Sequence, residues 1–389
     1  MKLLIKYSLV AIVFGFGFFI FSKITTDHNI VKNLPETDST LTLVFMGDVM
    51  QHQTQIDGAW NDSLQTYAYD SCFKYVEPII RQSDVAIANF EFTLGGKPYT
   101  GYPQFSAPEQ IVNALLWSGI NIVGTANNHS CDRGRMGIER TIRLLDSAQL
   151  KHTGTFVNKQ ERDANYPMII RKKGFKLALL NYTYGTNGIS IPQPTLVNLI
   201  DTLQMKLDLK RATDSVCDKT IVFIHWGDEY QSQPNQFQKD IAQLCLVHGA
   251  DIIIGMHPHV IQRIERKNFP DSSGRQVMVA YSLGNFVSNQ RDRYKDGGLM
   301  VQLQLTKKHN ATTITNCGYY LSWVYTPVEN GRKRFYILPV GKFENEKPTI
   351  DAESYQKMMV YATDSRHLMQ TESIGIGELH YDLKTDVWK

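Results

Sequence analysis

The sequence predicts an α/β fold, because two kinds of pattern alternate along most of the chain. Short apolar runs rich in β-branched residues indicate strands covered on both faces, and Ile252 to Ile254 is the clearest of them. Helical periodicity separates these runs, and such alternation is typical of an α/β sandwich rather than a helix bundle. Five of the runs end in carboxylate, carboxamide or imidazole side chains. We therefore expect the functional site where the strand ends meet.

Length and composition limit this interpretation. A chain of 389 residues with 42% hydrophobic residues can bury one large core or two smaller ones. Its 20% charged and 11% aromatic residues are typical of a globular protein. The net charge of +3 is too small by itself to indicate nucleic-acid binding. The five cysteines are scattered without a C-x-x-C pair, which argues against a cysteine zinc knuckle.

The N-terminal segment differs in character from the rest. Residues 7–22 contain no charged side chain, and the apolar stretch around them is long enough to cross a bilayer. No small-residue cleavage site follows it, so we favour an uncleaved signal anchor over a cleaved signal peptide. Lys2 and Lys6 would hold its N-terminal end in the cytoplasm, which predicts a single-pass protein of the cell membrane with an extracytoplasmic domain. We assign residues 1–26 to this transmembrane anchor and residues 27–40 to a polar linker.

The five apolar runs with polar ends follow one another along the chain. They are Leu41–Asp48, Asp84–Glu91, Asn121–His129, Thr220–Tyr230 and Asp251–Val260. In the last run, Gly255 is expected to let the backbone turn sharply at the strand's end. The proline between His257 and His259 stiffens the loop that carries them. Oxygen and nitrogen donors that converge from several strand ends suit one divalent transition-metal ion or a pair of them.

Each of these polar residues also has a purely structural interpretation. Asp48 and Asn128 are residue types that cap helices and turns, and two histidines in a loop can occur without a metal. Glu91 is harder to explain in this way, because a carboxylate in an apolar strand is costly unless it is paired or coordinated. Trp226, Tyr230 and Phe286 are more typical of a core than of a substrate site, although Tyr230 beside Glu229 could face a polymer.

Helix patterns lie between the runs. They cover Pro108–Trp117, Arg135–Ala148, Leu199–Ala212 and Asn235–Val247. Beyond Phe286 the pattern changes to the period-two alternation of antiparallel strands. That alternation covers residues 298–305, 312–325 and 333–340. One more helix is expected at residues 352–363. We therefore delimit a main domain at residues 41–345 and a C-terminal helix with a polar tail at residues 346–389.

Six short motifs carry a resemblance to a known family. They are Gly47-Asp-Val-Met50, Asn89-Phe-Glu91, Ala126-Asn-Asn-His129, His225-Trp-Gly-Asp-Glu-Tyr230, Gly255-Met-His-Pro-His-Val260 and Ser282-Leu-Gly-Asn-Phe286. This ordered set resembles the CapA family of bacterial capsule and poly-γ-glutamate synthesis, which is similar to the calcineurin-like metallophosphoesterases. The resemblance implies a four-layer αββα sandwich, in which helices flank two sheets and the site lies at the carboxyl ends of the strands.

The resemblance also implies a role for each site residue. The metal ligands would be Asp48, Glu91, Asn128, His225, His257 and His259. Glu91 would bridge two ions. Asn128, His225 and His257 would complete the shell of the first ion, and Asp48 and His259 that of the second. His129 would be the catalytic residue, which gives a proton or a hydrogen bond to the substrate without binding metal. The expected substrate contacts are Asn89, Asn127, Glu229, Tyr230 and Asn285.

Two positions depart from the phosphoesterase pattern. Met50 stands where that pattern has a histidine ligand, and Asn89-Phe-Glu91 replaces Gly-Asp-x-x-Asp. The second ion therefore has fewer ligands, and we expect one tight site and one weak site for Zn²⁺ or Mn²⁺. His52 could replace the missing ligand, or it could be a surface residue.

Two classes of function agree with this set of residues. One is a metal-dependent hydrolase or transferase that acts on an anionic envelope polymer such as poly-γ-glutamate or capsule material. The other is a non-catalytic polymer-binding or export component that works with other membrane subunits. Neither class involves nucleic acid. A serine nucleophile at Ser282 is disfavoured, because the Gly-x-Ser-x-Gly context is missing. Arg291, Arg293 and Lys295 could meet an anionic polymer or form a solvated loop.

Overall fold

A computed structural model gives the structure of most of the chain. It describes residues 39–271, 274–309, 311–344, 350–382, 385 and 387–388. The predicted anchor at residues 1–26 lies outside this part, and so do residues 27–38 of the predicted linker. None of the helices in the described residues combines the length and the apolar character that a bilayer crossing requires.

Two large sheets form the centre of the described domain. In the first, the strand order is β20-β17-β16-β1-β4-β5-β6, with β15 paired to β1 and β21 paired to β17. Its strands are β1 Ser39–Val49, β4 Val85–Phe90, β5 Ile122–Gly124, β6 Lys151–Thr153, β15 Asn285–Val287, β16 Gly297–Lys308, β17 Ala311–Tyr325, β20 Tyr336–Pro339 and β21 Gly377–Glu378. Strands β1, β4, β5 and β6 run parallel, whereas β16, β17 and β20 pair antiparallel. The predicted antiparallel strands after Phe286 are therefore confirmed.

The second sheet has the strand order β13-β14-β12-β11-β9-β8. Its strands are β8 Met168–Lys172, β9 Phe175–Thr183, β11 Lys219–His225, β12 Ile252–Met256, β13 Ile264–Asn268 and β14 Gln276–Ala280. Strands β9, β11, β12 and β14 run parallel. The sequence analysis identified β11 and β12 but not β8, β9, β13 or β14.

Helices and short strand pairs complete the described domain. The helices are α1 Gln53–Ala59, α2 Asp70–Phe73, α3 Glu77–Ile80, α4 Gln110–Ser118, α5 Gly134–Ser147, α6 Lys159–Asn165, α7 Thr202–Asp214, α8 Gln236–Val247, α9 Val340–Phe343 and α10 Ala352–Glu372. The short pairs are β2 Trp60–Asn61 with β3 Thr66–Tyr67, β7 Thr155–Phe156 with β10 Leu196–Val197, β18 Val328–Glu329 with β19 Arg332–Lys333, and β22 Tyr381–Asp382 with β23 Val387–Trp388.

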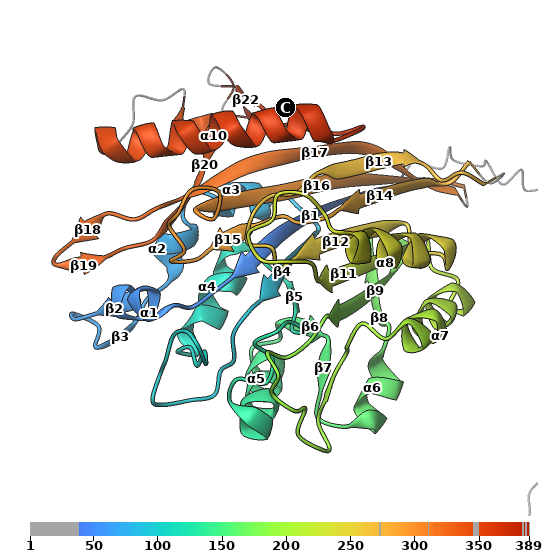
Figure 1. Cartoon of the computed structure of the whole chain (residues 1–389), viewed down its shortest axis with the longest axis horizontal. Helices are drawn as coiled ribbons and strands as arrows, with labels where there is room; N and C mark the ends of the chain where they lie inside the picture. Colours follow the sequence, from blue (N-terminus) through green and yellow to red (C-terminus); the bar gives the residue numbers. More distant parts are fainter. Residues whose placement is uncertain are drawn as a thin grey trace, which may run out of the picture. The chain divides into compact units, whose positions relative to one another are not determined.

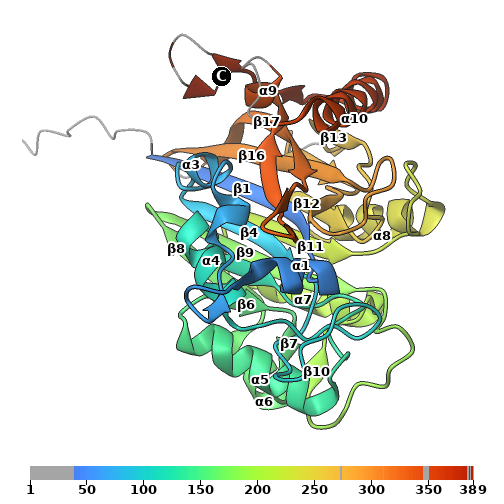
Figure 2. The ribbon, with the colours of Figure 1, turned by 90° about the vertical axis from the view of Figure 1, so that its left-hand side faces the viewer.

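The core explains why the central strands are apolar on both faces. In β1, Leu43 and Phe45 join the cluster between the two sheets, which also contains Phe223 of β11. The alternate residues Val44 and Met46 join a second cluster under α2, α3 and α4. A third cluster holds the outer face of β9, β11 and β12 against α7 and α8. The predicted α/β fold is confirmed, and its layers run helices, sheet, sheet, helices (Figures 1 and 2).

Two helices have an end that differs from the sequence prediction by three residues or more. Helix α7 begins at Thr202 rather than Leu199, because the Asp201 side chain caps it by accepting hydrogen bonds from the backbone N–H groups of the first turn. Helix α10 continues past Thr363 to Glu372. Its later turns bury Met369 in the core cluster between the sheets, so packing extends this helix where the local pattern fades. Figure 1 shows α10 lying over β17.

The two sheets bring the carboxyl ends of their parallel strands to one place. Strand β1 pairs with β4 through Phe45 and again from Asp48, with an irregular register between them. An irregularity of this kind re-aims side chains at the end of a strand. It leaves Asp48 opposite Asn285 of β15 and within hydrogen-bond distance of the loop after β12, where it accepts from His257 N at 3.3 Å.

Candidate metal centre

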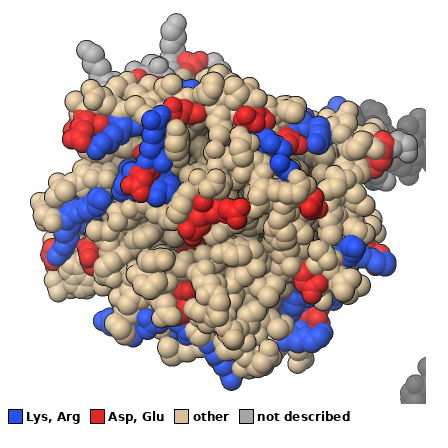
Figure 3. Space-filling view, in the orientation of Figure 1, with Lys and Arg blue, Asp and Glu red and all other residues tan. Residues whose placement is uncertain are grey.

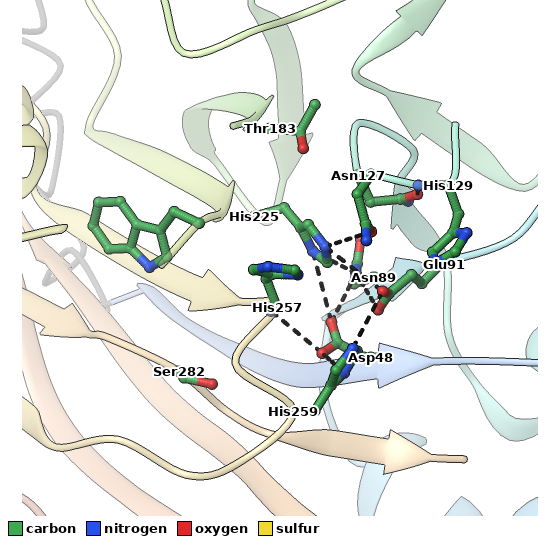
Figure 4. Close-up of polar contacts among 12 residues, drawn as sticks. Asp48, Asn89, Glu91, Asn127, His129, Thr183, His225, His257, His259 and Ser282 are labelled. Carbon is green, nitrogen blue, oxygen red and sulfur yellow. Dashed lines mark hydrogen bonds and ion pairs between the residues drawn. The ribbon is translucent and has the colours of Figure 1, made fainter. Parts of the chain in front are cut away.

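The two carboxylates and three histidines that were predicted to bind metal converge into one buried cluster (Figure 4). Ligand atoms of Asp48, Glu91 and His225 lie within 4.8 Å of one another, and so do those of Glu91, His257 and His259. All five side chains are buried. They come from β1, the end of β4, β11 and the loop after β12, so both sheets contribute to the cluster.

The distances show which histidines lie near which carboxylate. His225 Nε2 lies 3.6 Å from Glu91 Oε1, and His225 Nδ1 lies 3.9 Å from Asp48 Oδ1. His259 Nε2 lies 3.8 Å from the same Glu91 oxygen. Glu91 is common to both groups, in agreement with a bridging role. Ligand atoms of His225 group with those of Asp48, and those of His257 group with those of His259. His259 Nδ1 also lies 3.2 Å from Asp48 Oδ2, and the ring centroids of His225 and His257 lie 4.7 Å apart. These contacts are equally compatible with the predicted division, which placed His225 and His257 on one ion and Asp48 and His259 on the other. Which imidazole faces which carboxylate depends on the packing of the two sheets, and the motifs do not encode it.

Burial sets the charge state of this cluster. Burial, and then the neighbouring Asp48 carboxylate, raise the pKa of Glu91 well above its usual value. Burial, followed by the neighbouring His257, holds the pKa of His225 well below its usual value. For His257 the same cause, reinforced by His259, lowers the pKa to about 3. The imidazoles of His225 and His257 are therefore neutral and offer lone pairs.

Three buried polar atoms test whether these residues fit a metal ion. Glu91 Oε1, His257 Nδ1 and Asn89 Oδ1 are buried, and none has a hydrogen-bond partner among the described residues. Such unsatisfied groups are costly unless something coordinates them. A set of carboxylate oxygens and neutral imidazole nitrogens is the ligand chemistry of Zn²⁺ and Mn²⁺. The residues therefore fit a divalent metal. Each of the two groups of ligand atoms that share Glu91 would hold one ion.

The loop that carries two of the histidines is conformationally strained. His257 and His259 have φ angles of 95° and 57°, in the left-handed region that non-glycine residues rarely occupy. Backbone strain of this kind concentrates at functional sites. The predicted turn at Gly255 is wrong, because β12 continues through this residue to Met256. A Cβ atom at position 255 would lie 2.0 Å from Tyr281 O, so the glycine is needed for close packing.

His129 stands beside the cluster without joining either group of ligand atoms. Its Nδ1 lies 2.7 Å from Asp132 Oδ2, and its ring packs edge-on against Phe105 with 4.5 Å between centroids. The same carboxylate oxygen accepts a hydrogen bond from the Phe105 backbone at 2.8 Å. A carboxylate on Nδ1 fixes the tautomer and orientation of an imidazole, so Nε2 is the nitrogen available for chemistry. Sequence reasoning missed Asp132, although its spacing of three residues from His129 could have indicated it.

Comparison with known proteins assigns the chain to a family. Residues 42–290 match the model of the family described as bacterial capsule synthesis protein PGA_cap. The chain belongs to the PGA_cap family. It is 31% identical over 290 residues to the capsule biosynthesis protein CapA of Bacillus anthracis, covering 70% of this chain and 66% of that protein, about two thirds of its length. It is 26% identical over 363 residues to the PGA biosynthesis protein CapA of Bacillus subtilis (strain 168), covering 89% of this chain and 83% of that protein.

Among solved structures, the fold is similar to the calcineurin-like phosphoesterase YfkN from Bacillus subtilis. The similarity has a TM-score of 0.42 at 12% identity and covers 85% of this chain and 98% of that one. All the site residues named so far lie inside the segment that matches the PGA_cap model.

The asparagines of this PGA_cap protein lie in and around the ligand set. Asn89 Nδ2 donates to Asp48 Oδ1 at 2.8 Å and lies 3.2 Å from His225 Nδ1. Asn128 Oδ1 lies 3.0 Å from His225 Nε2, at the edge of the cluster, and its ligand role stays a prediction. Because Asn89 is fully buried among the ligands, its side chain positions them and the predicted substrate contact is not supported.

Two further residues predicted to contact substrate are also fully buried. Asn127 donates to Phe90 O at 2.8 Å and accepts from His129 N at 3.0 Å. Asn285 Oδ1 lies 3.0 Å from His259 Nδ1, a contact that orients the imidazole. These two side chains hold the loops of the PGA_cap site, and they do not face a polymer. Sequence patterns could not separate a positioning amide from a substrate-binding one.

Glu229 and Tyr230, by contrast, are exposed at the rim. The Tyr230 ring lies 6.1 Å from the ring of His259. Tyr184 forms another part of the wall, because its ring lies 4.5 Å from that of His257 while 41% of the residue remains exposed. Tyr184 directly follows β9, a strand end that the sequence analysis missed.

The departure from the phosphoesterase pattern at Met50 has a structural explanation, and so does the position of His52. Met50 is 2% exposed and packs in the apolar cluster under α2, α3 and α4, so its thioether belongs to the core. His52 precedes α1 and its Nδ1 accepts a hydrogen bond from Asn289 N at 3.2 Å. It belongs to neither group of ligand atoms. Burial lowers the pKa of His52 to about 4, so the imidazole is neutral at physiological pH.

Other residues near the motifs are structural. Trp226 and Phe286 are fully buried in the core, as the sequence predicted. Ser282 donates to Val260 O at 2.7 Å and is fully buried. Figure 4 shows its side chain apart from the histidine cluster, so it is not a nucleophile.

Proposed function

We propose that this PGA_cap protein is a metal-dependent hydrolase or transferase that acts on an anionic envelope polymer. The observation that carries the proposal is the pair of buried ligand groups that share Glu91. Catalytic chemistry requires a proton donor near such a centre, and His129, held by Asp132 through a contact of 2.7 Å, lies beside it.

The roles of the chain's own residues follow from this arrangement. A divalent ion held by Glu91 and its neighbours would supply Lewis acidity and activate water at neutral pH. Asp132 accepts a hydrogen bond from Nδ1 of His129, and in the imidazolium form of His129 the Nε2–H gives a proton or a hydrogen bond to the leaving group. Tyr184 covers the imidazole of His257 and limits the access of bulk water from that side. Tyr230 at the rim offers a flat surface to a long substrate.

The identity of the polymer rests on the relatives. One relative is called a capsule biosynthesis protein and another a PGA biosynthesis protein, so capsule material or poly-γ-glutamate is the proposed substrate. Zn²⁺ or Mn²⁺ is the proposed ion, with one tight and one weak site. Other membrane subunits are the proposed protein partners, and no nucleic acid is involved.

The test of activity uses the full chain in detergent. The protein is incubated with poly-γ-glutamate of defined length in the presence of Mn²⁺ or Zn²⁺, and the length of the polymer is followed by size-exclusion chromatography. We expect shortening or transfer that chelation abolishes and that His129→Ala slows. Unchanged polymer length with each metal, for both poly-γ-glutamate and purified capsule polymer, would contradict the proposal.

A second candidate function is a polymer-binding or export component without turnover. It is favoured by the two departures from the phosphoesterase pattern, because the amide of Asn89 occupies a position among the ligands and Met50 belongs to the core. In the same assay this protein would retain the polymer at unchanged length.

We further propose that residues 1–26 anchor the protein in the cell membrane with the domain outside. The support is the uncharged stretch at residues 7–22, with Lys2 and Lys6 before it. Protease added to intact spheroplasts should digest the domain. A protected domain, or a mature protein that starts near Thr26, would contradict this topology.

A further inference from the structure

Three cations follow the last motif of the site, and the structure gives them different environments. The guanidinium of Arg291 donates to Val324 O and lies over the Trp323 ring, 5.4 Å from its centroid. Arg293 is paired with Asp364 of α10, and the Nε contact measures 2.8 Å. Both arginines therefore tie this loop to the body of the domain.

Lys295 is placed differently, because its ammonium group lies at the rim of the metal centre. Its Nζ is 4.3 Å from the centroid of the Tyr230 ring, and that ring is 6.1 Å from the ring of His259. Tyr230 is 45% exposed. A cation over an exposed aromatic ring is thus held next to a candidate metal ligand.

This arrangement is fixed to the metal centre by several contacts. Tyr230 N donates to Pro258 O at 2.7 Å, and Tyr230 has a φ of 66°. Asn285 Nδ2 donates to Lys295 O at 2.8 Å, while Asn285 Oδ1 lies 3.0 Å from His259 Nδ1. A tyrosine in the left-handed region is uncommon and marks a functional constraint. The same amide therefore positions the backbone of Lys295 and the imidazole of His259.

The charges at the rim of the centre favour a cation where an anionic substrate would pass. Asp48 and Glu91 are inside the cluster, and Glu229 is exposed at its rim. Figure 3 shows a group of acidic side chains near the middle of the face that it presents, with Lys and Arg side chains around it. A divalent ion would offset Asp48 and Glu91, so Glu229 is the carboxylate at the rim that a cation would have to offset for an anionic polymer.

The ion pair that Lys295 makes can be replaced by a ligand. Its Nζ lies 2.7 Å from Asp292 Oδ2, and the Asp292 side chain is 84% exposed. Exposed pairs of this kind contribute little to stability. An incoming anion can therefore take the place of the Asp292 carboxylate without cost to the fold.

We propose that Lys295, supported by Tyr230, forms a subsite for a carboxylate of the polymer next to the bond held at the metal centre. The inference rests on the proposed function for the identity of the polymer. The ammonium binds the carboxylate as a point charge, and the ring of Tyr230 supports the chain of the substrate. The subsite would set the register of a carboxylate-bearing chain relative to Glu91 and His129.

Binding of poly-γ-glutamate to the full-length protein tests the subsite, with and without chelator, so that the result does not depend on turnover. Lys295→Gln should weaken binding about tenfold, the effect of a lost charge-assisted hydrogen bond. Lys295→Arg should restore most of it, and Asp292→Asn should tighten it about twofold or more, because the competing carboxylate is gone. Lys210→Gln is the matched control, because Lys210 is paired with Asp214 at 2.8 Å on the outer helix α7; this variant should bind like the parent.

Several outcomes would overturn the subsite. Parental affinity in Lys295→Gln, or a parent that does not bind poly-γ-glutamate, would do so. A loss confined to inorganic polyphosphate of matched length would show that the ligand is a phosphate chain. If the parent shortens the polymer and Lys295→Gln does so with an unchanged KM, the subsite fails while the proposed function stands. Weaker binding in Lys295→Gln without turnover in the parent supports the subsite and refutes the enzyme.

Discussion

Replacing Glu91 by glutamine is expected to remove both metal ions, whereas replacing one histidine is expected to remove one. Glu91 belongs to both groups of ligand atoms, but His225 belongs only to the group with Asp48, and His257 only to the group with His259. Glutamine has the shape of a protonated glutamate. Because burial raises the pKa of Glu91 well above its usual value, the Glu91→Gln protein should fold without metal at least as well as the parent.

The expected size of the effect follows from linkage. An ion present at 100 times its dissociation constant stabilises the folded state by about 2.7 kcal/mol. An unfolding entropy of about 2.1 cal/mol/K per residue gives about 0.7 kcal/mol/K for a domain of about 350 residues. Each ion should therefore raise the Tm by about 4 °C, and two ions by about 8 °C.

The assay is thermal unfolding with added Mn²⁺ or Zn²⁺, beside the metal content after dialysis. Glu91→Gln should show no metal-induced rise in Tm, and His225→Ala or His257→Ala should each keep about 4 °C of it. The double variant should lose the whole effect. His248→Ala, at an exposed histidine just beyond α8, is the matched control. If the double variant keeps as much stabilisation as either single variant, both histidines serve one ion and the division into the two groups of ligand atoms is refuted.

Four further outcomes are expected. His129→Ala should lower turnover by roughly two to four powers of ten with unchanged metal content. Asp132→Asn should lower turnover less and should shift the pH profile of the reaction. Loss of metal in His129→Ala would instead make His129 a metal ligand. In chelator, the parent should lose stability relative to Glu91→Gln as pH rises above 4.5 toward the raised pKa of Glu91, because the folded state binds that proton more tightly. As pH falls from 6.5 toward 3, the lowered pKa of His257 should destabilise the metal-free protein, because the unfolded state binds that proton more tightly; thermal melts across this pH range measure both effects. Met50→His should cost about 1–3 kcal/mol of stability and add no ion, because the side chain lies in an apolar cluster; a tighter second ion in metal titrations would show that position 50 faces the centre.

The sequence alone determined the fold class and the general place of the site. Runs such as Ile252 to Ile254 can be stable only when both faces are covered, so local patterns predict a central sheet. A carboxylate such as Glu91 at the end of an apolar strand needs a partner, which points to a site without knowledge of the fold. The period-two pattern after Phe286 likewise predicted β16, β17 and β20. These features depend on residues close together in the chain.

The tertiary structure decided which of the selected residues lie in contact with one another. The irregular pairing of β1 with β4 turns Asp48 toward the loop after β12, and the packing of the two sheets groups His225 with Asp48. Neither contact has a local signature, because the partners are far apart in sequence. The same holds for Asn285, which was predicted to contact substrate and instead orients His259. It also holds for Lys295, whose ammonium group lies over the Tyr230 ring, whereas the neighbouring arginines contact Val324 and Asp364. Pattern and composition report burial and periodicity, whereas side-chain direction at a strand end depends on neighbours that only the folded chain brings together.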